Sequence, residues 1–521
     1  MKTFASKIWK IWDNAFGKQS LVKLSFITMG ITSTIWFFIR VIPKPHRATY
    51  PCMRTAAPIM SGFVIYLLTL VGTIAAYKKA KSNFQRANYY YGILFLGIAI
   101  VGFIAFMSQK TEIAFSKTKA EWVIKPNQPM GVAQGIHPGR VVWVHNPGVA
   151  KWDGKTGNWW DENVTSQKGA DKMLTQSLTT LTGEKVEKKA WAALFKHFNI
   201  KQKRASLTYQ SNQKIAVKIN TNNTYGHKNS EEINATPQLV LSLLKSLVNE
   251  AGIPQKNITI FDASRFITDN IFDKCHSAFP DVVFVDNIGG DGRVKSTYVD
   301  NAIPYTVDNG KLATGLATCA VEADYLINMA LLKGHVGQGV TLCAKNYYGV
   351  TSIHNDWRKN AHNNFDQDRD GNPKYLTFVD FLAHKDLGEK TMLFLIDGIY
   401  GAKLVNGVPA PKWKMAPFNN DWACSLMASQ DPVAIDAVGL DLLRSEWPDL
   451  LDIAFSDQYL FEAALANNPP SKTVYDPQRN NAKVSSLGVM EHWNNAAEKK
   501  YSRNLGKKEG IELLQTTIQS N

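Results

Sequence analysis

Three neighbouring segments of the chain read IAVKIN (215–220), PQLVLSLLKSLVNEA (237–251) and ITIFD (258–262). The first and third are short runs rich in β-branched residues, which is typical of buried strands, and the second has the apolar stripe of an amphipathic helix. Thr236 suits the start of that helix, and Gly252 suits the position just after its end. A strand, a helix and a second strand in this order predict a β-α-β unit with parallel strands.

The same alternation extends on both sides of this unit. Further strand candidates are residues 141–144, 282–285, 325–327 and 393–396. We therefore predict an α/β fold with a mostly parallel sheet and flanking helices. Because ligands of such sheets bind outside the carboxyl ends of the strands, the residues at those ends are the first candidates for function.

Most of the predicted strands end in polar residues. Lys218 and Asn220 close the first strand and are candidate ligand-binding groups, whereas Asp262 and Asp397 are candidate catalytic carboxylates that would serve a metal ion or a proton. The alternative is that the aspartates and asparagines only start turns or cap the following helices.

A glycine-rich motif, GHVGQGVTLCAKN, occupies residues 334–346. Gly337 and Gly339 allow the backbone to come close to a ligand, and a helix that begins near Thr341 would direct its amides at an anion. The motif matches neither GxGxxG nor GxxxxGK[ST], so the sequence does not support a standard nucleotide loop.

The same motif contains three polar side chains that are candidates for ligand binding or proton transfer. Lys345 lies one helical turn after Thr341 and would bind an anion or transfer a proton, and Asn346 would bind the ligand. His335 titrates near neutral pH and is a candidate proton shuttle. The alternative is a glycine-rich turn that carries a solvated lysine.

The segment DQDRDG (366–371) resembles the first half of a calcium loop, because Asp366, Asp368 and Asp370 alternate before a glycine. It is not an EF-hand, since position twelve is Thr377 and not Glu. A looser Ca²⁺ loop would need a distant carboxylate to close it, and the alternative is a hydrophilic turn.

The segment QDPVAIDAVG (430–439) contains two further carboxylates. Asp431 precedes a proline and is explained as a helix N-cap. Asp436 lies within an apolar run, where a carboxylate is costly unless it is paired or liganded. We therefore take Asp436 as a candidate catalytic group.

Charge is distributed unevenly along the 521 residues. Residues 1–110 contain 14 Lys and Arg and one acidic residue, a net charge of +13, whereas residues 111–521 contain 45 basic and 43 acidic residues, a net charge of +2. A domain of charge +2 lacks the electrostatic footprint of a nucleic-acid-binding protein.

The basic N-terminal part contains long apolar windows. Residues 55–77 and 87–109 each lack a charged residue over 23 positions, which is long enough for a helix to cross a bilayer. Residues 24–39 form a shorter window that spans only if Lys23 and Arg40 extend to the interfaces. The preceding basic leader has the pattern of a short helix on an anionic membrane surface, or of a frayed leader.

These features divide the chain into five regions: an amphipathic leader (1–20), a three-helix membrane anchor (21–110), an N-terminal extension (111–211), an α/β core (212–445) and a C-terminal helical extension (446–521). An inner N-terminus, which basic residues favour by nine against eight, would put the domain outside the cytoplasm, in the periplasm of a bacterium. The five cysteines contain no CxxC pair, which argues against a cysteine-ligated iron–sulfur cluster.

Several of these motifs occur together in one family. VKIN (217–220), the helix from Thr236, the strand ending at Asp262, the motif 334–346, IDG (396–398) and DPVAID (431–436) resemble, in this order, the domain of unknown function 362 family. The resemblance covers residues 212–445. It implies an α/β domain with a polar cleft and an exported or membrane-associated protein. Some members carry ferredoxin-type cluster motifs, and this chain has none.

Two classes of function fit the sequence. The first is a membrane-anchored protein whose domain binds a small anionic or metal-associated ligand at the carboxyl ends of its strands and acts as an enzyme on it. The second is a tethered, non-catalytic scaffold module that a calcium loop stiffens. The lipid bilayer is the expected partner in both, and the sequence does not tell whether the protein also has protein partners.

Overall fold

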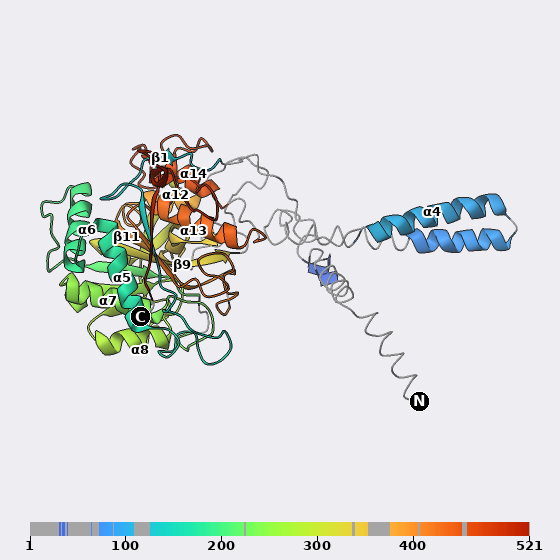
Figure 1. Ribbon diagram of the computed structural model, residues 1–521. Coiled ribbons are helices and arrows are strands. Elements are labelled where there is room, and N and C mark those ends of the chain that lie inside the picture. Colours follow the sequence, from blue (N-terminus) through green and yellow to red (C-terminus); the bar gives the residue numbers. More distant parts are fainter. Residues whose placement is uncertain are drawn as a thin grey trace, which may run out of the picture. The chain divides into compact units, whose positions relative to one another are not determined.

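The chain is described here from a computed structural model, shown in Figure 1. The structure describes residues 31–32, 34–36, 39, 64, 72–86, 88–108, 125–222, 226–335, 339–352, 376–404, 407–450 and 456–519. The chain divides into two compact units, Met1–Thr118 and Lys119–Asn521.

The longest described helical segments of the first unit are residues 72–85 and α4 (Tyr89–Ser108). Of the helices that the structure describes, none combines the length and the apolar character that a membrane span requires. The predicted leader (1–20) lies outside the described residues, as do most positions of the predicted spans 24–39 and 55–77.

The second unit is built on a sheet of ten strands in the order β14-β2-β12-β11-β9-β3-β4-β5-β6, with β10 paired to β9. Its strands are β2 (Arg140–His145), β3 (Ile215–Ile219), β4 (Ile258–Asp262), β5 (Val283–Asp286), β6 (Val294–Lys295), β9 (Tyr325–His335), β10 (Gly339–Thr341), β11 (Thr391–Ala402), β12 (Ser425–Ser429) and β14 (Glu512–Thr517).

Neighbouring strands of this sheet are parallel, except that β12 is antiparallel to β2 and β11 and that β10 is antiparallel to β9. The predicted mostly parallel α/β sheet is therefore confirmed. β3, β9 and β11 are buried over their whole length, which explains their continuous apolar character: both faces of a parallel sheet are covered.

Helices cover both faces of the sheet (Figure 1). On one face, α5 (Gln167–Thr182), α6 (Glu187–Lys201), α7 (Pro237–Lys245) and α8 (Asp269–Ala278) share one hydrophobic core with the sheet. On the other, α10 (Cys343–Asn346), α12 (Thr377–Ala383), α13 (Pro432–Glu446) and α14 (Gln458–Ala464) share the second core. The unit is thus a three-layer α/β/α structure.

The predicted helix 237–251 is α7, continued by one turn of π-helix over Ser246–Glu250. Gly252 follows it with φ +72°, a left-handed conformation that suits glycine after a helix end. Thr236 precedes α7 as expected, although its side chain makes no capping hydrogen bond.

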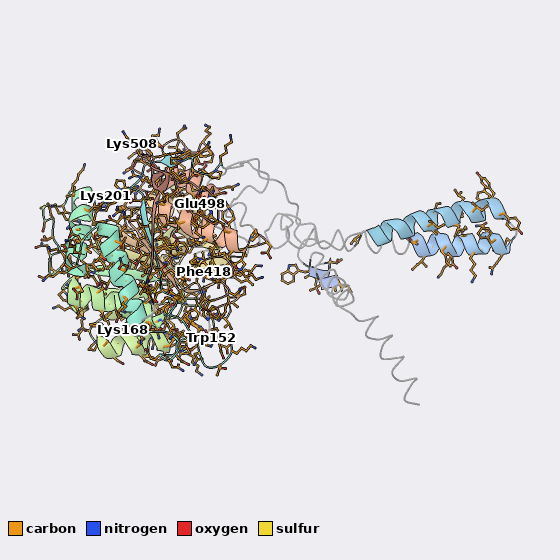
Figure 2. All side chains as sticks on the ribbon, in the orientation of Figure 1. Trp152, Lys168, Lys201, Phe418, Glu498 and Lys508 are labelled. Atoms are coloured by element: carbon orange, nitrogen blue, oxygen red, sulfur yellow. The ribbon has the colours of Figure 1, made fainter. Side chains whose placement is uncertain are left out.

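Two small antiparallel sheets complete the unit, β1 (Met130–Gly131) with β13 (Val489–Met490) and β7 (Tyr298–Pro304) with β8 (Ala313–Ala317). The region after residue 446, where the sequence predicts a helical extension, contains α14 together with β13 and β14. Charged side chains of both signs, such as Lys168, Lys508 and Glu498, lie exposed around this unit (Figure 2), in accord with its small net charge.

The order of the strands defines where a ligand of this sheet would bind. The chain runs outward from β3 to β4 and β5, and it then returns to place β9 on the opposite side of β3. This reversal makes the carboxyl ends of β3 and β9 a topological switch point, which is where open α/β sheets bind their ligands.

Candidate functional site

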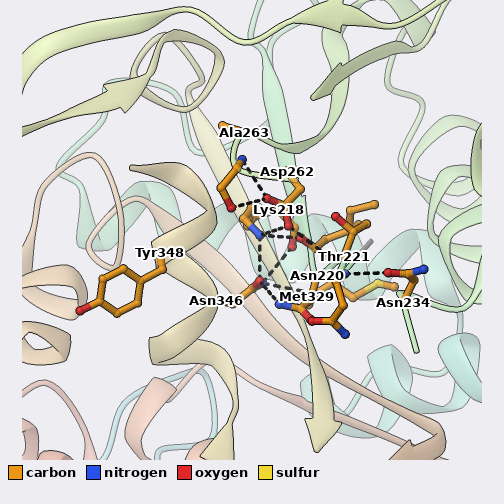
Figure 3. Close-up of polar contacts among 12 residues, drawn as sticks. Lys218, Asn220, Thr221, Asn234, Asp262, Ala263, Met329, Asn346 and Tyr348 are labelled. Carbon is orange, nitrogen blue, oxygen red and sulfur yellow. Dashed lines mark hydrogen bonds and ion pairs between the residues drawn. The ribbon is translucent and has the colours of Figure 1, made fainter. Parts of the chain in front are cut away.

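A buried lysine and aspartate lie at the switch point (Figure 3). Lys218 of β3 and Asp262 of β4 are each 1% exposed, and the Lys218 Nζ lies 3.0 Å from the Asp262 Oδ2. The same ammonium donates to the Asn346 Oδ1 at 2.8 Å and to the Ile219 carbonyl at 2.6 Å. A buried charge is costly unless it is paired and hydrogen-bonded, and these three acceptors meet that requirement for a protonated Lys218.

Asn346 joins the strands β3 and β9 to the short helix α10. Its amide donates to the Asn328 Oδ1 of β9 at 2.8 Å, while its oxygen also accepts from the Asn220 side chain at 3.2 Å. We refer to Lys218, Asn220, Asp262 and Asn346 as the lysine–aspartate network. Four of the residues that the sequence selected are therefore joined by hydrogen bonds.

Close backbone packing holds this network in place. Gly349 follows α10, and its carbonyl accepts a hydrogen bond from the Ala263 amide at 2.9 Å. A Cβ atom at position 349 would fall on the Lys218 Cε and Nζ and would lie 2.8 Å from the Asp262 Oδ1. Glycine at this position is therefore a steric requirement of the Lys218–Asp262 pair.

The hairpin of β9 and β10 brings a second group of polar residues to the same end of the sheet. Thr341 pairs with Lys333, and Gly339 pairs with His335. Directly opposed residues share a face of an antiparallel pair, and so do residues two apart on one strand. Lys333, His335 and Thr341 consequently lie on one face of the hairpin.

Lys333 is the most constrained of these groups. It is 0% exposed, and its ammonium donates to the Asn222 Oδ1 at 2.5 Å. Burial holds the pKa of Lys333 well below its usual value, and the positive charges of Lys345 and Arg265 lower it further. The negative charges of Asp262 and Glu232 act in the opposite direction, because they stabilise the charged lysine.

These interactions place Lys345, Arg265 and Glu232 in the electrostatic surroundings of Lys333. Lys345 and Arg265 are partly exposed, and so is Glu232, whose pKa is raised by burial and lowered in part by Arg265 and Lys333. We refer to Lys333, Lys345, Arg265 and Glu232 as the cation cluster. It contains three basic groups and one acidic group.

Several buried acceptors near the switch point have no hydrogen-bond partner among the described residues. They are the Asn220 Oδ1 and the hydroxyl oxygens of Thr221 and Thr341. Buried polar atoms are normally hydrogen-bonded, so each unpartnered atom calls for an explanation. A polar ligand or ordered water beside the network would supply the partners.

Asp436 holds the first residues of α10 by hydrogen bonds. It is 0% exposed in α13, and it accepts hydrogen bonds from the amides of Cys343 and Ala344 at 2.8 and 2.9 Å and from the Tyr459 hydroxyl at 3.1 Å. Burial raises the pKa of Asp436 to about 6, against the lowering effect of these donors. Asp436 thus anchors the start of the turn that carries Lys345 and Asn346, which is a positioning role.

The hydrogen bonds of Asp397 in the described part of the chain go to residues outside this group. Asp397 lies within β11, and it accepts hydrogen bonds from the amides of Thr236 at 2.7 Å and Ile399 at 3.1 Å. Burial raises the pKa of Asp397, while the two amides lower it. Its observed contacts are those of a carboxylate at the start of α7, which is the alternative that the sequence left open.

The structure therefore brings together most of the residues that the sequence selected. Lys218, Asn220, Asp262 and Asn346 form the network, and His335, Gly339, Thr341 and Lys345 belong to the adjoining hairpin and turn. Gly337 and the predicted calcium-loop residues Asp366, Asp368 and Asp370 lie outside the described residues, so the loop stays a prediction.

Sequence reasoning missed Lys333, Arg265 and Glu232. The signal for Lys333 was present, because it is the one charged residue in the otherwise uncharged run YLINMALLKGH (325–335). A lysine in a fully buried strand needs a functional or structural partner. Across the described ranges, no set of three or more His, Cys, Asp or Glu side chains is grouped as a metal site would require.

Fold and site together define a three-layer α/β domain with a lysine-rich polar site at the switch point of its sheet. Residues 215–441 match the model of the family described as Domain of unknown function (DUF362). The match confirms the resemblance found in the sequence. No curated protein matches the chain significantly.

Proposed function

We propose that this chain is a membrane-anchored protein whose α/β domain, outside the cytoplasm, binds a small anionic ligand at the carboxyl ends of β3, β4 and β9. The anchor rests on the two charge-free windows of 23 residues in the sequence. The outward orientation rests on three spans with an inner N-terminus.

The cation cluster carries the proposal for the ligand. The Lys218–Asp262 pair is neutral and its ammonium already has three acceptors, so it contributes little net attraction. Lys333 lies in the electrostatic surroundings of two further cations, Lys345 and Arg265, and of the Glu232 carboxylate. Like charges gathered in a partly buried place repel one another, and an anion among them removes that repulsion.

Each group has a distinct role in this proposal. Lys345 and Arg265 are partly exposed and meet the ligand first, whereas Lys333 provides a buried charge behind it. The Thr341 hydroxyl, opposite Lys333, is the neutral donor. His335, on the same face of the hairpin, is the group that would exchange a proton with the ligand if the protein is an enzyme.

The proposal is tested by thermal melting of the full-length chain with sulfate, phosphate, acetate and chloride at constant ionic strength. We expect sulfate or phosphate to raise the melting temperature in a saturable manner. Lys345→Met should weaken that binding about tenfold or more, since hydrogen bonds to charged groups contribute about 1.5–3 kcal/mol.

Lys295→Met is the matched control, because Lys295 is exposed on β6 and belongs to neither group. Its affinity for the anions should equal that of the unchanged chain. Equal affinities for the Lys345→Met and Lys295→Met variants, or no stabilisation by any of the anions, would refute the proposed site.

A further inference from the structure

Basic side chains gather around the place where the chain enters the second unit. Asn127 lies near the start of the described part of this unit, and its side-chain amide donates to the Lys500 carbonyl at 2.9 Å. The Asn127 carbonyl accepts a hydrogen bond from the Lys507 ammonium at 3.0 Å. The first residues of the unit therefore lie beside the turn that contains Lys500 and Lys507, although more than 370 positions separate them in sequence.

This turn is an ordered element directly before β14. The Leu505 amide donates to the Tyr501 carbonyl at 3.1 Å, and the turn closes at Gly506. Gly506 has φ +83°, a left-handed conformation that glycine adopts without strain. Residues 505–509 are exposed, so the turn presents a fixed set of side chains to its surroundings.

The charge of this surface is mainly positive. The exposed or partly exposed basic residues here form what we call the basic patch: Lys125, Lys500, Arg503, Lys507 and Lys508. The acidic residues beside it are the exposed Glu498 and Glu509 and the buried Glu491, which accepts from the Ser502 hydroxyl at 2.7 Å. Five positive charges against three leave an excess of +2, which equals the net charge of the whole region 111–521.

We propose that the basic patch binds the anionic surface of the membrane in which the chain is anchored, with Leu505 at the lipid interface. This inference rests on the anchor in the proposed function and adds a second membrane contact to it. Leu505 is 46% exposed between Arg503 and Lys507. An apolar side chain flanked by basic residues suits the boundary between lipid headgroups and acyl chains. Each Lys or Arg held near an anionic bilayer strengthens binding about fivefold.

The covalent connection favours lipid as the partner of this patch. Lys125 follows the predicted span 87–109 after 16 positions, and a chain of that length reaches at most about 55 Å. The tether keeps the patch at a high local concentration beside the bilayer, so a small excess of charge is enough for binding. A soluble acidic protein or a nucleic acid would lack this advantage.

The patch and the candidate anion site lie at opposite ends of the sheet. The turn precedes β14, so it lies at the amino end of this strand, which runs parallel to β2. β3, β4 and β9 run in the same direction as β2, and the candidate site lies at their carboxyl ends. A domain bound to the membrane through the patch would therefore keep the candidate site directed away from the lipid.

Hydrogen exchange of the full-length chain in lipid nanodiscs tests this inference. Discs of phosphatidylcholine are compared with discs of equal parts of phosphatidylcholine and phosphatidylglycerol, at low and at high salt. We expect the amides of residues 503–508 to exchange about tenfold more slowly in the anionic discs at low salt, because bound lipid opposes the opening of the turn. High salt should remove the difference, since it screens the attraction.

A pair of charge reversals assigns this protection to the patch. Lys500→Glu combined with Lys508→Glu should abolish the difference between the two kinds of disc, and both side chains are exposed, so the fold should be retained. Lys168→Glu combined with Lys172→Glu is the matched control, because these lysines are exposed on α5 and their reversal changes the net charge of the chain equally. Lys168 and Lys508 lie toward opposite ends of the domain (Figure 2).

The outcomes separate this inference from the proposed function. Slow exchange that requires anionic lipid, disappears in the Lys500 and Lys508 double variant and persists in the control supports the inference. A chain that stays in both kinds of disc at high salt, but whose turn exchanges equally in both at low salt, overturns the inference and leaves the anchor; an acidic protein partner would give this result. A chain that leaves both kinds of disc at high salt contradicts the anchor and, with it, the inference.

Discussion

At the scale of single residues, the Lys218–Asp262 pair depends both on its hydrogen-bond partners and on the missing side chain at Gly349. Three acceptors satisfy the ammonium, and the Ser264 amide and hydroxyl both donate to the Asp262 Oδ1 at 3.1 Å. Removing one partner of such a pair leaves an uncompensated buried charge. This loss destabilises the fold more than the replacement of both partners by apolar residues. The absence of a side chain at Gly349 is part of this arrangement.

Gly349→Ala tests the steric requirement. The added methyl group would fall on the Lys218 side chain, so the ion pair or the backbone must move, and we expect a loss of about 1–3 kcal/mol in the free energy of unfolding. Denaturant titration followed by tryptophan fluorescence measures this loss. Gly97→Ala is the control, because its methyl group meets nothing within 4 Å. Equal stability of the Gly349→Ala variant and the unchanged chain would contradict the packing argument.

The sequence could predict the lysine–aspartate network because the chemistry is local to strand ends. Lys218, Asn220 and Asp262 lie at the carboxyl ends of two parallel strands, and parallel strands bring these ends to one edge of the sheet. Lys333 was missed although it is the one charged residue of its run, because the predicted strand ended at residue 327, whereas β9 continues to His335. The sequence also could not separate Asp397 from the site, since a carboxylate after a strand looks the same whether it caps a helix or meets a ligand.

At the scale of elements, α13 connects distant parts of the domain through carboxylates spaced five residues apart. Asp431 accepts hydrogen bonds from the amides of Gln134 at 2.9 Å and Val489 at 3.1 Å, besides capping its own helix. Asp436 anchors α10, and Asp441 accepts from the Tyr501 hydroxyl at 2.9 Å. One helix thus forms hydrogen bonds with the first residues of the domain, with the candidate site and with the C-terminal region.

The contact between Asp441 of α13 and His492 predicts that the stability of the fold depends on pH. His492 lies 2.5 Å from the Asp441 carboxylate and 3.6 Å from that of Asp457, and these carboxylates raise the pKa of His492 to about 9 although burial and Arg444 oppose this. Since the folded pKa lies above the ordinary 6.5, this histidine stabilises the fold fully below pH 6.5, and the stabilisation disappears as pH rises through 9. The shift corresponds to about 3 kcal/mol.

Melting curves between pH 6 and 10 test this expectation. The melting temperature of the unchanged chain should fall from pH 7 to 10, whereas His492→Gln should melt lower at pH 7 and vary less over the same interval. His276→Gln, a change in α8, should keep the pH dependence of the unchanged chain. The same slope in His492→Gln and the unchanged chain would contradict the assignment to His492.

The elements themselves show which part of a fold local patterns determine. The predicted strands at 215–219, 258–261, 282–285 and 393–396 all lie within or next to observed strands. The pattern did not predict that β12 would run antiparallel between β2 and β11 or that β14 would pair with β2. The pairings of β2 with β12 and with β14 join residues far apart in sequence, and strand order depends on packing that no short window contains.

At the scale of the whole molecule, the charge distribution and the division into units agree. The change from a net charge of +13 to +2 occurs near residue 110, and the compact units divide after Thr118. Basic residues that flank apolar windows are typical of segments at a membrane surface, whereas an almost neutral domain attracts few polyanions. The large positive charge of the chain is therefore expected to concern its location and not its ligand.

Membrane fractionation tests this division of roles. We expect the full-length chain to remain in the membrane pellet after an alkaline carbonate wash, because hydrophobic spans resist conditions that remove electrostatically bound proteins. A chain that begins after Thr118 should move to the supernatant and should keep the sulfate affinity of the full-length chain. Release of the full-length chain by carbonate would contradict the anchor. Loss of sulfate binding in the shortened chain would instead show that the N-terminal unit contributes to the site.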